Sequence, residues 1–265
     1  MVRASPVLDP TPGHVAIVVP CHNEERRLMG ETFLAHAARH PWLHFTFVND
    51  GSSDGTGTLL AALCERSPGR LSLLDLKSNQ GKAEAVRRGV LSALEAGPAW
   101  VGYWDADLAT PLEAIEDLLA AAPEGSSVEL AMGSRVRLLG RDIRRRAMRH
   151  YAGRVFATAA SLTLGIPVYD TQCGAKLFRV TETTPALFAE PFRSRWIFDV
   201  ELIARRLAGT TAAERARVGE LIVEVPLRQW HDVKGSKVRP LDLVVAMWEL
   251  VVIAYRYRRR HATPL

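Results

Sequence analysis

Two aspartates separated by one small residue, Asp105 and Asp107, directly follow the apolar run 99–104. At the end of a strand this spacing leaves the two carboxylates about 6 Å of backbone apart, so that one cation can meet both. Hard carboxylate oxygens suit Mg²⁺ or Mn²⁺, and such an ion commonly keeps waters and bridges a substrate diphosphate. Taken alone, the pair is better explained as a solvated loop or a helix cap before Thr110 and Pro111.

Two further polar clusters also follow apolar runs. In the turn Asn49–Asp54, helix capping accounts for the last two residues, whereas Asp50 sits where a carboxylate can accept the N–H of a nucleotide base. The cluster Asn79–Lys82 opens a predicted helix, where backbone N–H groups, the helix dipole and the Lys82 ammonium suit a phosphate. The alternative for Lys82 is an ordinary surface lysine in a first helical turn.

The elements that position these clusters alternate between strand and helix. The first half predicts strands over 14–20, 43–48, 71–76, 99–104 and 127–133, and helices over 24–39, 56–66, 83–96 and 112–122. The second half predicts helices over 143–164, 198–207 and 240–260, and strands over 175–180 and 221–225. This order predicts an α/β fold with a mostly parallel central sheet flanked by helices, and ligands at the carboxyl ends of its strands.

Composition limits the class of protein. The chain has 265 residues with 48% hydrophobic and 24% charged side chains, which excludes disorder and fibrous repeats. The longest nearly uncharged stretch, 243–255, is too short to span a bilayer, and residues 1–13 are expected to be a flexible leader rather than a signal peptide. We therefore expect a cytosolic protein with no transmembrane helix. Its three widely spaced cysteines are expected to be ordinary buried thiols.

Charge is distributed unevenly. Residues 1–133 carry 10 basic and 17 acidic side chains, whereas 134–154 carry 8 and 1, and 226–265 carry 8 and 3. Apolar residues recur at helical spacing in the basic segment 141–165 and in the last predicted helix, which is bordered by Trp and Tyr. These patterns favour amphipathic helices lying in lipid headgroups, and the alternative is core helices with solvated basic ends.

The order of motifs resembles a known family. PCHNEE (Pro20–Glu25), NDGSSD, NQGK and DAD resemble the family 2 inverting glycosyltransferases, which have the Rossmann-like GT-A fold. The later motifs resemble the dolichyl-phosphate β-glucosyltransferase branch more than the mannose synthase branch; they are DTQCGAKLF (170–178), RWIFDVEL (195–202) and GSKV (235–238). Matching motifs cover roughly residues 14–257. The resemblance implies a catalytic domain over 14–225 and, over 226–265, an acceptor-side loop and a basic amphipathic helix.

The family's activity implies a metal-dependent enzyme that moves a sugar from a nucleotide donor, UDP-glucose in this branch, to a polyprenyl phosphate at the cytoplasmic face of a membrane. On this resemblance the donor would be held by Pro20, Asn23, Glu24, Asp50, Lys82, Asp105 and Ala106. Mg²⁺ or Mn²⁺ would be held by Asp105 and Asp107, the pair assigned to catalysis. The acceptor would be held by Ser134, Arg135, Arg149, Lys176, Ser236 and Lys237. Charge-assisted bonds from the basic members would orient a lipid phosphate.

The reaction requires no assigned base. A lipid monophosphate is ionised at neutral pH, so its oxygen can attack the anomeric carbon directly while charge on the leaving diphosphate is neutralised. Inversion of an α-linked donor gives a β-linked lipid phosphosugar. Asp199 and Glu201 match an acidic pair of the family, and we assign them structural or loop-ordering work rather than general-base work.

Three alternatives remain open from the sequence. A GDP-mannose-dependent polyprenyl-phosphate mannose synthase would share most motifs, although Ala109 stands where those enzymes carry a metal-binding glutamine. A transferase with a soluble acceptor would need no basic amphipathic helices. A nucleic-acid-binding protein is the most remote, because the first half is acidic and no RNA-binding motif is present. We therefore expect a nucleotide sugar, a polyprenyl phosphate and an anionic membrane as partners, and no nucleic acid.

Overall fold

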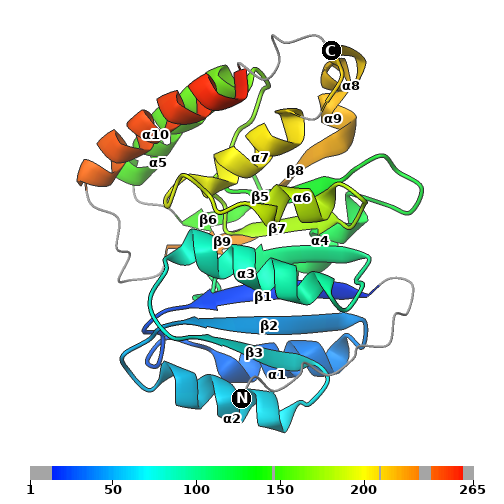
Figure 1. Cartoon of the computed structure of the whole chain (residues 1–265), viewed down its shortest axis with the longest axis vertical. Coiled ribbons are helices and arrows are strands. Elements are labelled where there is room, and N and C mark those ends of the chain that lie inside the picture. Colours follow the sequence, from blue (N-terminus) through cyan, green and yellow to red (C-terminus); the bar gives the residue numbers. More distant parts are fainter. Residues whose placement is uncertain (1–13, 145–146, 209, 233–239, 259–265) are drawn as a thin grey trace. The chain divides into compact units, whose positions relative to one another are not determined.

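A computed structural model describes residues 14–144, 147–208, 210–232 and 240–258 (Figure 1). By their internal contacts the residues form two units, each made of two stretches of sequence. The first unit contains the chain up to Leu108 and the segment Ala175–Pro191, and the second contains Ala109–Gly174 and the chain from Phe192 onward. The domain boundary expected after residue 225 falls inside a strand of the second unit.

The first unit is built on a sheet whose strand order is β3-β2-β1-β4-β7. Its strands are β1 (Val15–Cys21), β2 (Leu43–Asp50), β3 (Leu71–Leu76), β4 (Trp100–Trp104) and β7 (Ala175–Arg179). The first four run parallel, and β7 runs antiparallel to β4, with Lys176 opposite Tyr103. Every residue of β2 is buried, including the polar residues His44, Thr46, Asn49 and Asp50, as expected for an inner strand of a sheet covered on both faces. The parallel strands bring their carboxyl ends to one edge of the sheet.

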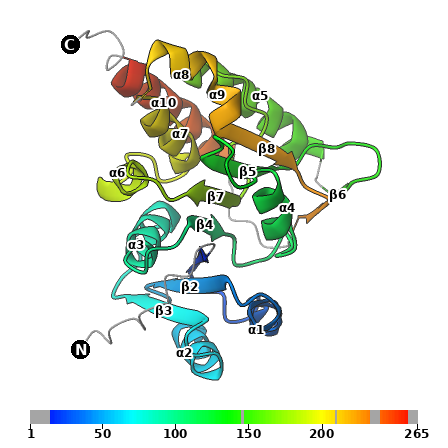
Figure 2. The same cartoon turned by 90° about the vertical axis from the view of Figure 1, so that its right-hand side faces the viewer.

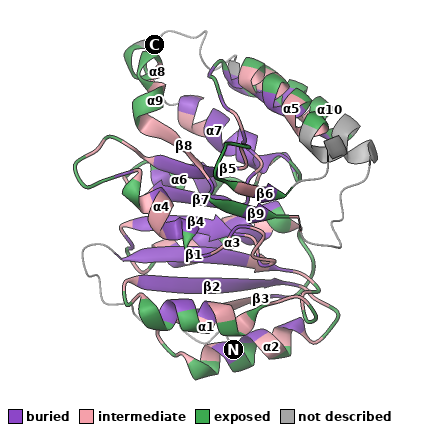
Figure 3. Cartoon of the chain, turned by 180° about the vertical axis from the view of Figure 1, so that it is seen from behind, coloured by how far each residue is buried: buried purple, intermediate pink, exposed green. Residues whose placement is uncertain are grey.

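Helices cover both faces of this sheet. They are α1 (Gly30–Arg39), α2 (Thr56–Arg66), α3 (Lys82–Leu94) and the short α6 (Thr184–Ala189). Phe33 of α1 packs edge-on against Phe45 and Phe47 of β2, at ring-centroid distances of 5.2 and 5.1 Å. Gly89 of α3 instead lies against Val18 and Val48, which point from the opposite face because side chains alternate along a strand. Figure 1 accordingly shows α3 in front of the strands, and Figure 3 shows α1 and α2 in front.

The second unit contains two short pairs of parallel strands and a group of helices (Figure 2). The strand pairs are β5 (Leu130–Ser134) with β8 (Ile222–Pro226), and β6 (Asp142–Arg144) with β9 (Gln229–His231). The helices are α4 (Ala114–Ala120), α5 (Ala147–Leu164), α7 (Phe198–Ala208), α8 (Ala212–Ala216), α9 (Val218–Leu221) and α10 (Pro240–Arg258). Helices α5 and α10 lie side by side, and both contact α7.

The two long helices are apolar on their buried and on their exposed sides. In α10, the residues Leu250, Ile253 and Tyr257 recur at helical spacing and are buried in the unit. The same helix also exposes six large apolar or aromatic residues, which are Val245, Met247, Trp248, Val251, Val252 and Tyr255. In α5, the exposed set is Tyr151, Val155 and Leu162. Each helix therefore has a core-packed face and an exposed apolar face; the first agrees with the interpretation as core helices, and contact of the second with lipid headgroups stays a prediction.

Two predicted helix starts are wrong. The helix predicted over 24–39 begins at Gly30, because the N–H of Glu24 donates to the Thr56 hydroxyl and that of Glu25 to Asp54, which ties this segment to the turn after β2. The helix predicted from residue 143 begins at Ala147, because 142–144 pair with β9. The expected leader 1–13 lies outside the described residues. Among the helices that are described, none combines the length and apolarity needed to cross a bilayer.

Candidate donor-binding and metal site

The segment between β1 and α1 lies on the turn that follows β2. Asn23, whose φ is +54°, donates its N–H to Ser52 Oγ at 3.0 Å and accepts the Ser53 N–H at its side-chain oxygen at 2.9 Å. The Glu24 N–H donates to Thr56 Oγ1 at 2.8 Å. Two predicted donor residues are thus held against the turn that carries a third, Asp50. Thr56 was missed in the sequence, because a threonine at the start of a helix is also an ordinary capping residue.

Asp50 joins this turn to the next one. Its side chain is buried, and its two oxygens accept the N–H groups of Gln80 at 2.7 Å and Gly81 at 2.9 Å. A carboxylate offers about four lone-pair directions, so each oxygen keeps one for a ligand. The neighbouring Gly51 has φ +56°, and a Cβ there would lie 2.4 Å from the backbone N of Asn79. The turns after β2 and β3 are therefore packed backbone to backbone at the start of α3.

Lys82, the first residue of α3, reaches the end of β4. Its Nζ lies 2.5 Å from Asp105 Oδ1, and the two side chains are 42% and 35% exposed. Both groups are accessible, so an anion can bind the ammonium and a cation the carboxylate. Ala106 is buried, Asp107 is half-buried, and Leu108 at φ +51° completes the turn. Lys82 and Asp105, assigned to donor binding on separate motifs, are thus direct neighbours.

The residues at the end of β4 fit a hard divalent cation. Asp105 and Asp107 supply two carboxylates in one tight turn, and Asp105 already pairs with a cation, the Lys82 ammonium. Proteins usually bind Mg²⁺ through one or two carboxylates, and the substrate's phosphates supply further ligands. Pro20 is the sixth residue of β1, beside Val48 of β2. The predicted donor residues from β1, β2, α3 and β4 therefore gather at the carboxyl edge of one sheet.

The cysteine of this edge has no nucleophilic role. Cys21, the last residue of β1, is buried, and burial raises the pKa of its thiol, as does the nearby Glu24 carboxylate. A thiol in this state stays protonated. Cys173 is also buried and Cys64 is half-buried, with the pKa of Cys64 raised by burial to about 11. The described chain thus carries the ordinary buried thiols expected, with Cys64 the least covered.

On the acceptor side, Ser134 is the last residue of β5 in the second unit, and Arg135 follows it. Ser134 is buried, and the Arg135 guanidinium makes two bonds to Asp170, from Nε at 2.6 Å and from Nη2 at 2.7 Å. The guanidinium also lies over the ring of Trp230, with Cζ 5.3 Å from the centroid. The N–H of Asp170 in turn donates to Glu224 at 2.7 Å. Two of the five N–H groups of the Arg135 guanidinium therefore bind Asp170, and these two bonds fix the orientation of the side chain.

The remaining acceptor residues are placed differently. Lys176 lies in β7 of the first unit; it is buried, and its ammonium is 5.4 Å from the centroid of the Tyr103 ring. Arg149 lies in α5, but its side chain is outside the described residues, as are Ser236 and Lys237. The structure therefore describes the surroundings of three of the six acceptor residues, divided between the two units.

Glu201 orders the loop before α7. Its buried carboxylate accepts the N–H groups of Arg193 and Ser194 at one oxygen, at 2.8 and 3.1 Å. The other oxygen accepts from Arg205 at 2.9 Å and from the Tyr257 hydroxyl at 3.0 Å. All of these partners belong to the second unit, and they tie the loop to α7 and α10. The loop-ordering work predicted for Glu201 is confirmed. Asp199 is buried two residues earlier on the same helix.

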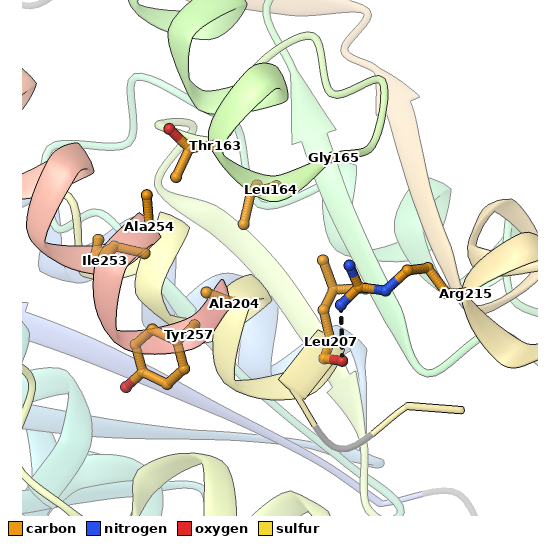
Figure 4. A pocket seen from close by; sticks show the side chains of 9 residues that line it. All are labelled: Thr163, Leu164, Gly165, Ala204, Leu207, Arg215, Ile253, Ala254 and Tyr257. Carbon is orange, nitrogen blue, oxygen red and sulfur yellow. Dashed lines mark hydrogen bonds between the residues drawn. The ribbon is translucent and has the colours of Figure 1, made fainter. Parts of the chain in front are cut away.

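A small pocket lies between α5, α7 and α10 (Figure 4). Its volume is about 60 Å³, and it is lined by Thr163, Leu164, Gly165, Ala204, Leu207, Arg215, Ile253, Ala254 and Tyr257. In Figure 4 Arg215 points across to the Leu207 carbonyl, to which it donates a bond of 3.2 Å. A volume of this size is well below the roughly 300–1,000 Å³ of drug-sized ligand sites. The pocket is a packing gap between helices rather than a nucleotide-sugar site.

Comparison with known proteins matches the family described as Glycosyl transferase family 2 to residues 16–182. A dolichyl-phosphate beta-glucosyltransferase of Dictyostelium discoideum is 30% identical over 92% of this chain and 75% of its own length. One of Drosophila melanogaster is 32% identical over 95% of this chain and 78% of its own length. A polyprenol monophosphomannose synthase of Mycolicibacterium smegmatis is 26% identical over 88% and 85%, respectively.

Among solved structures, glucosyl-3-phosphoglycerate synthase from Mycobacterium tuberculosis in complex with Mn²⁺ and uridine-diphosphate-glucose is similar with a TM-score of 0.59. Its sequence is 18% identical, and the match covers 96% of this chain and 81% of that one. At this identity the likeness concerns the fold. The expected fold, a mostly parallel GT-A sheet flanked by helices, is confirmed.

Proposed function

The chain belongs to glycosyl transferase family 2, in the branch of the dolichyl-phosphate β-glucosyltransferases, and on that premise we propose that it transfers glucose from UDP-glucose to a polyprenyl phosphate with inversion. The products are a β-linked lipid phosphosugar and UDP. The names of its relatives support the sugar and the acceptor, and the carboxyl edge of the first sheet supports the donor.

One observation carries the donor side of the proposal. Asp50 holds the Gln80 and Gly81 amides at the start of α3, whose Lys82 reaches Asp105 across 2.5 Å. Three groups therefore lie at one helix N-terminus, where anions are stabilised. The Asp50 carboxylate can accept from a nucleobase, the Lys82 ammonium can bind a phosphate, and the Asp105 carboxylate can bind a cation. Asn23 and Glu24, bonded to the same turn, complete the wall of a nucleoside site.

The chemistry divides among these residues as follows. Lys82 binds the donor diphosphate, exchanging its ion pair with Asp105 for a phosphate oxygen. Asp105 and Asp107 would hold a divalent cation, Mg²⁺ or Mn²⁺, which would supply charge neutralisation for the leaving diphosphate. An ionised lipid phosphate attacks the anomeric carbon on the face opposite the diphosphate, and no side chain has to remove a proton. Arg135, held rigid by Asp170, orients that phosphate, and the family resemblance assigns the acceptor also to Ser134, Arg149, Lys176, Ser236 and Lys237.

A lipid acceptor requires a membrane surface, and we propose that the enzyme works at the cytoplasmic face. The uncovered faces of α5 and α10 support this location, because α10 exposes Trp248 at 68% and Tyr255 at 63%, next to the exposed Arg256. Aromatic residues beside arginine are typical of helices at the headgroup level. Since the buried side of α10 packs in the core, the membrane contact belongs to its outer face alone.

The test is transfer of label from UDP-glucose, and in parallel from GDP-mannose, into organic-extractable lipid with polyprenyl phosphate and Mn²⁺ or Mg²⁺. We expect glucose label that a chelator abolishes. Mannose label alone would assign the chain to the activity of its M. smegmatis relative, and glucosylation of a water-soluble acceptor alone would refute the lipid acceptor. As a matched variant, Trp248→Ser should reduce transfer to acceptor in anionic vesicles more than transfer in detergent, since it removes only an exposed side chain.

A further inference from the structure

The turn that connects β5 to β6 carries two exposed leucines at its tip. Leu139 is 104% exposed and Leu138 is 49% exposed, which makes Leu139 the most exposed of the large apolar residues described. The turn is closed by the Arg141 N–H, which donates to the Leu138 carbonyl at 3.2 Å, and Gly140 adopts φ +79°. Two adjacent leucines at the tip of an ordered turn are unfavourable in water, because each leaves apolar surface solvated.

The base of this turn is firmly held. On one side, Arg135 makes the two side-chain bonds to Asp170 described above, and its backbone N–H donates to the same carboxylate at 3.0 Å. On the other side, Ile143 of β6 is buried and pairs with Trp230 of β9. The leucines are therefore presented on a fixed support within the second unit.

The charges around the tip are of one sign. Arg137 and Arg141, both exposed, flank the two leucines, and no acidic residue occurs between 135 and 141. The nearest acid, Asp142, is bonded to Arg144 at 2.9 Å and to His231 at 2.9 Å. An apolar tip collared by arginines is complementary to a bilayer with anionic headgroups, where apolar groups enter hydrocarbon and each basic residue stays at the phosphates.

We propose that the turn Val136–Arg141 inserts Leu138 and Leu139 into an anionic phospholipid bilayer. This inference deepens the proposed function, because it rests on a membrane-borne acceptor and because the turn directly follows Ser134 and Arg135, which are assigned to acceptor binding. Insertion fixes the end of β5 at the headgroup level, which is the level of a polyprenyl phosphate in the same leaflet.

The first test is co-sedimentation of the full chain with vesicles of phosphatidylcholine containing anionic phosphatidylserine. Changing both leucines to serine should lower the vesicle partition coefficient on the order of 100-fold, since each leucine withdrawn from hydrocarbon is worth roughly one power of ten. Met29→Ser should leave partition unchanged; Met29 is an apolar residue of the first unit whose exposure, 54%, is close to that of Leu138. An unchanged urea midpoint will show that the double variant still folds.

The second test reads insertion directly. In a Cys64→Ser background, where Cys21 and Cys173 are buried, Leu139→Cys carries an environment-sensitive fluorophore. Its emission should shift to the blue with vesicles and be quenched by lipids that carry a quencher in the acyl chain. The same label at Glu124→Cys, in the exposed loop before β5, should not respond.

The outcomes are distinct. Vesicle binding without a response at residue 139 would overturn the inference and leave the proposed function standing. Emission that is already blue-shifted without vesicles would mean that protein, such as a second copy of the chain, covers the turn, and would also overturn it. Neither measurement uses a sugar donor, so an enzyme that inserts the turn but transfers no glucose would refute the proposed function alone.

Discussion

Replacing Gly51 with alanine tests the contact between the turns after β2 and β3. Gly51 has φ +56°, and a Cβ there would lie 2.4 Å from Asn79 N, 2.4 Å from the Ser78 carbonyl carbon and 2.6 Å from Ser78 Cα. The left-handed backbone costs an alanine about 1–2 kcal/mol. The clash with backbone atoms adds about 1–3 kcal/mol, because these atoms cannot rotate away as a side chain can. We expect a total loss of about 2–5 kcal/mol in unfolding free energy.

Gly97→Ala is the matched control, since Gly97 has φ +65°, belongs to the same unit and has nothing within 4 Å of its Cβ position. It should lose only the backbone contribution of about 1–2 kcal/mol. Urea unfolding followed by tryptophan fluorescence measures both losses. Calorimetric titration with UDP and Mn²⁺ should show weaker binding for Gly51→Ala alone, because the displaced turn carries the amides that Asp50 holds. Equal losses of stability in the two variants would refute the argument from close approach.

Four further predictions follow from the described contacts. Asp107→Asn removes a ligand charge at little change of shape, so metal-dependent glucose transfer should fall about 100-fold or more at an unchanged urea midpoint; near-normal turnover would contradict the metal assignment. Lys82→Met should raise the KM for UDP-glucose about tenfold, and an unchanged KM would exclude a phosphate contact. Burial lowers the pKa of His44 to about 4, so the unfolded chain alone binds this proton between pH 6.5 and 4; stability should fall by about 3 kcal/mol over that range, and His44→Gln should flatten the slope of urea midpoint against pH. Glu201→Ala should cost about 3–5 kcal/mol by urea unfolding and the exposed Glu220→Ala under about 1 kcal/mol; similar losses would refute the loop-ordering role.

Local sequence was sufficient for most elements of the first sheet. The helix at 56–66 and the strand at 71–76 begin and end where predicted, because turn residues bound both segments and the spacing of their apolar residues differs. The segment 24–29 shows the limit. Its residues suit a helix, but the N–H groups of Glu24 and Glu25 are bonded to a turn about thirty positions away, and no local pattern reports such a partner.

The candidate site divides in the same way. Motif order identified Asp50, Lys82 and Asp105, because the carboxyl ends of parallel strands meet at one edge whatever the details of packing. The contacts between these residues depend instead on how close the turns come in space. Asp50 binds the amides of Gln80 and Gly81, and Lys82 pairs with Asp105. The segment 175–191 belongs to the first unit because β7 pairs antiparallel with β4. The residues around this segment in the sequence do not predict that pairing.

Residue types and their spacing were enough to predict an α/β protein with a series of nucleotide-sugar motifs and an apolar last helix that ends in basic residues. Which side of that helix lies in the core follows from the packing of the folded chain. Leu250, Ile253 and Tyr257 are buried, whereas Trp248 and Tyr255 are exposed, although all five are large and apolar or aromatic. The physical reason is that burial depends on which neighbours, here α5 and α7, occupy the space beside each face.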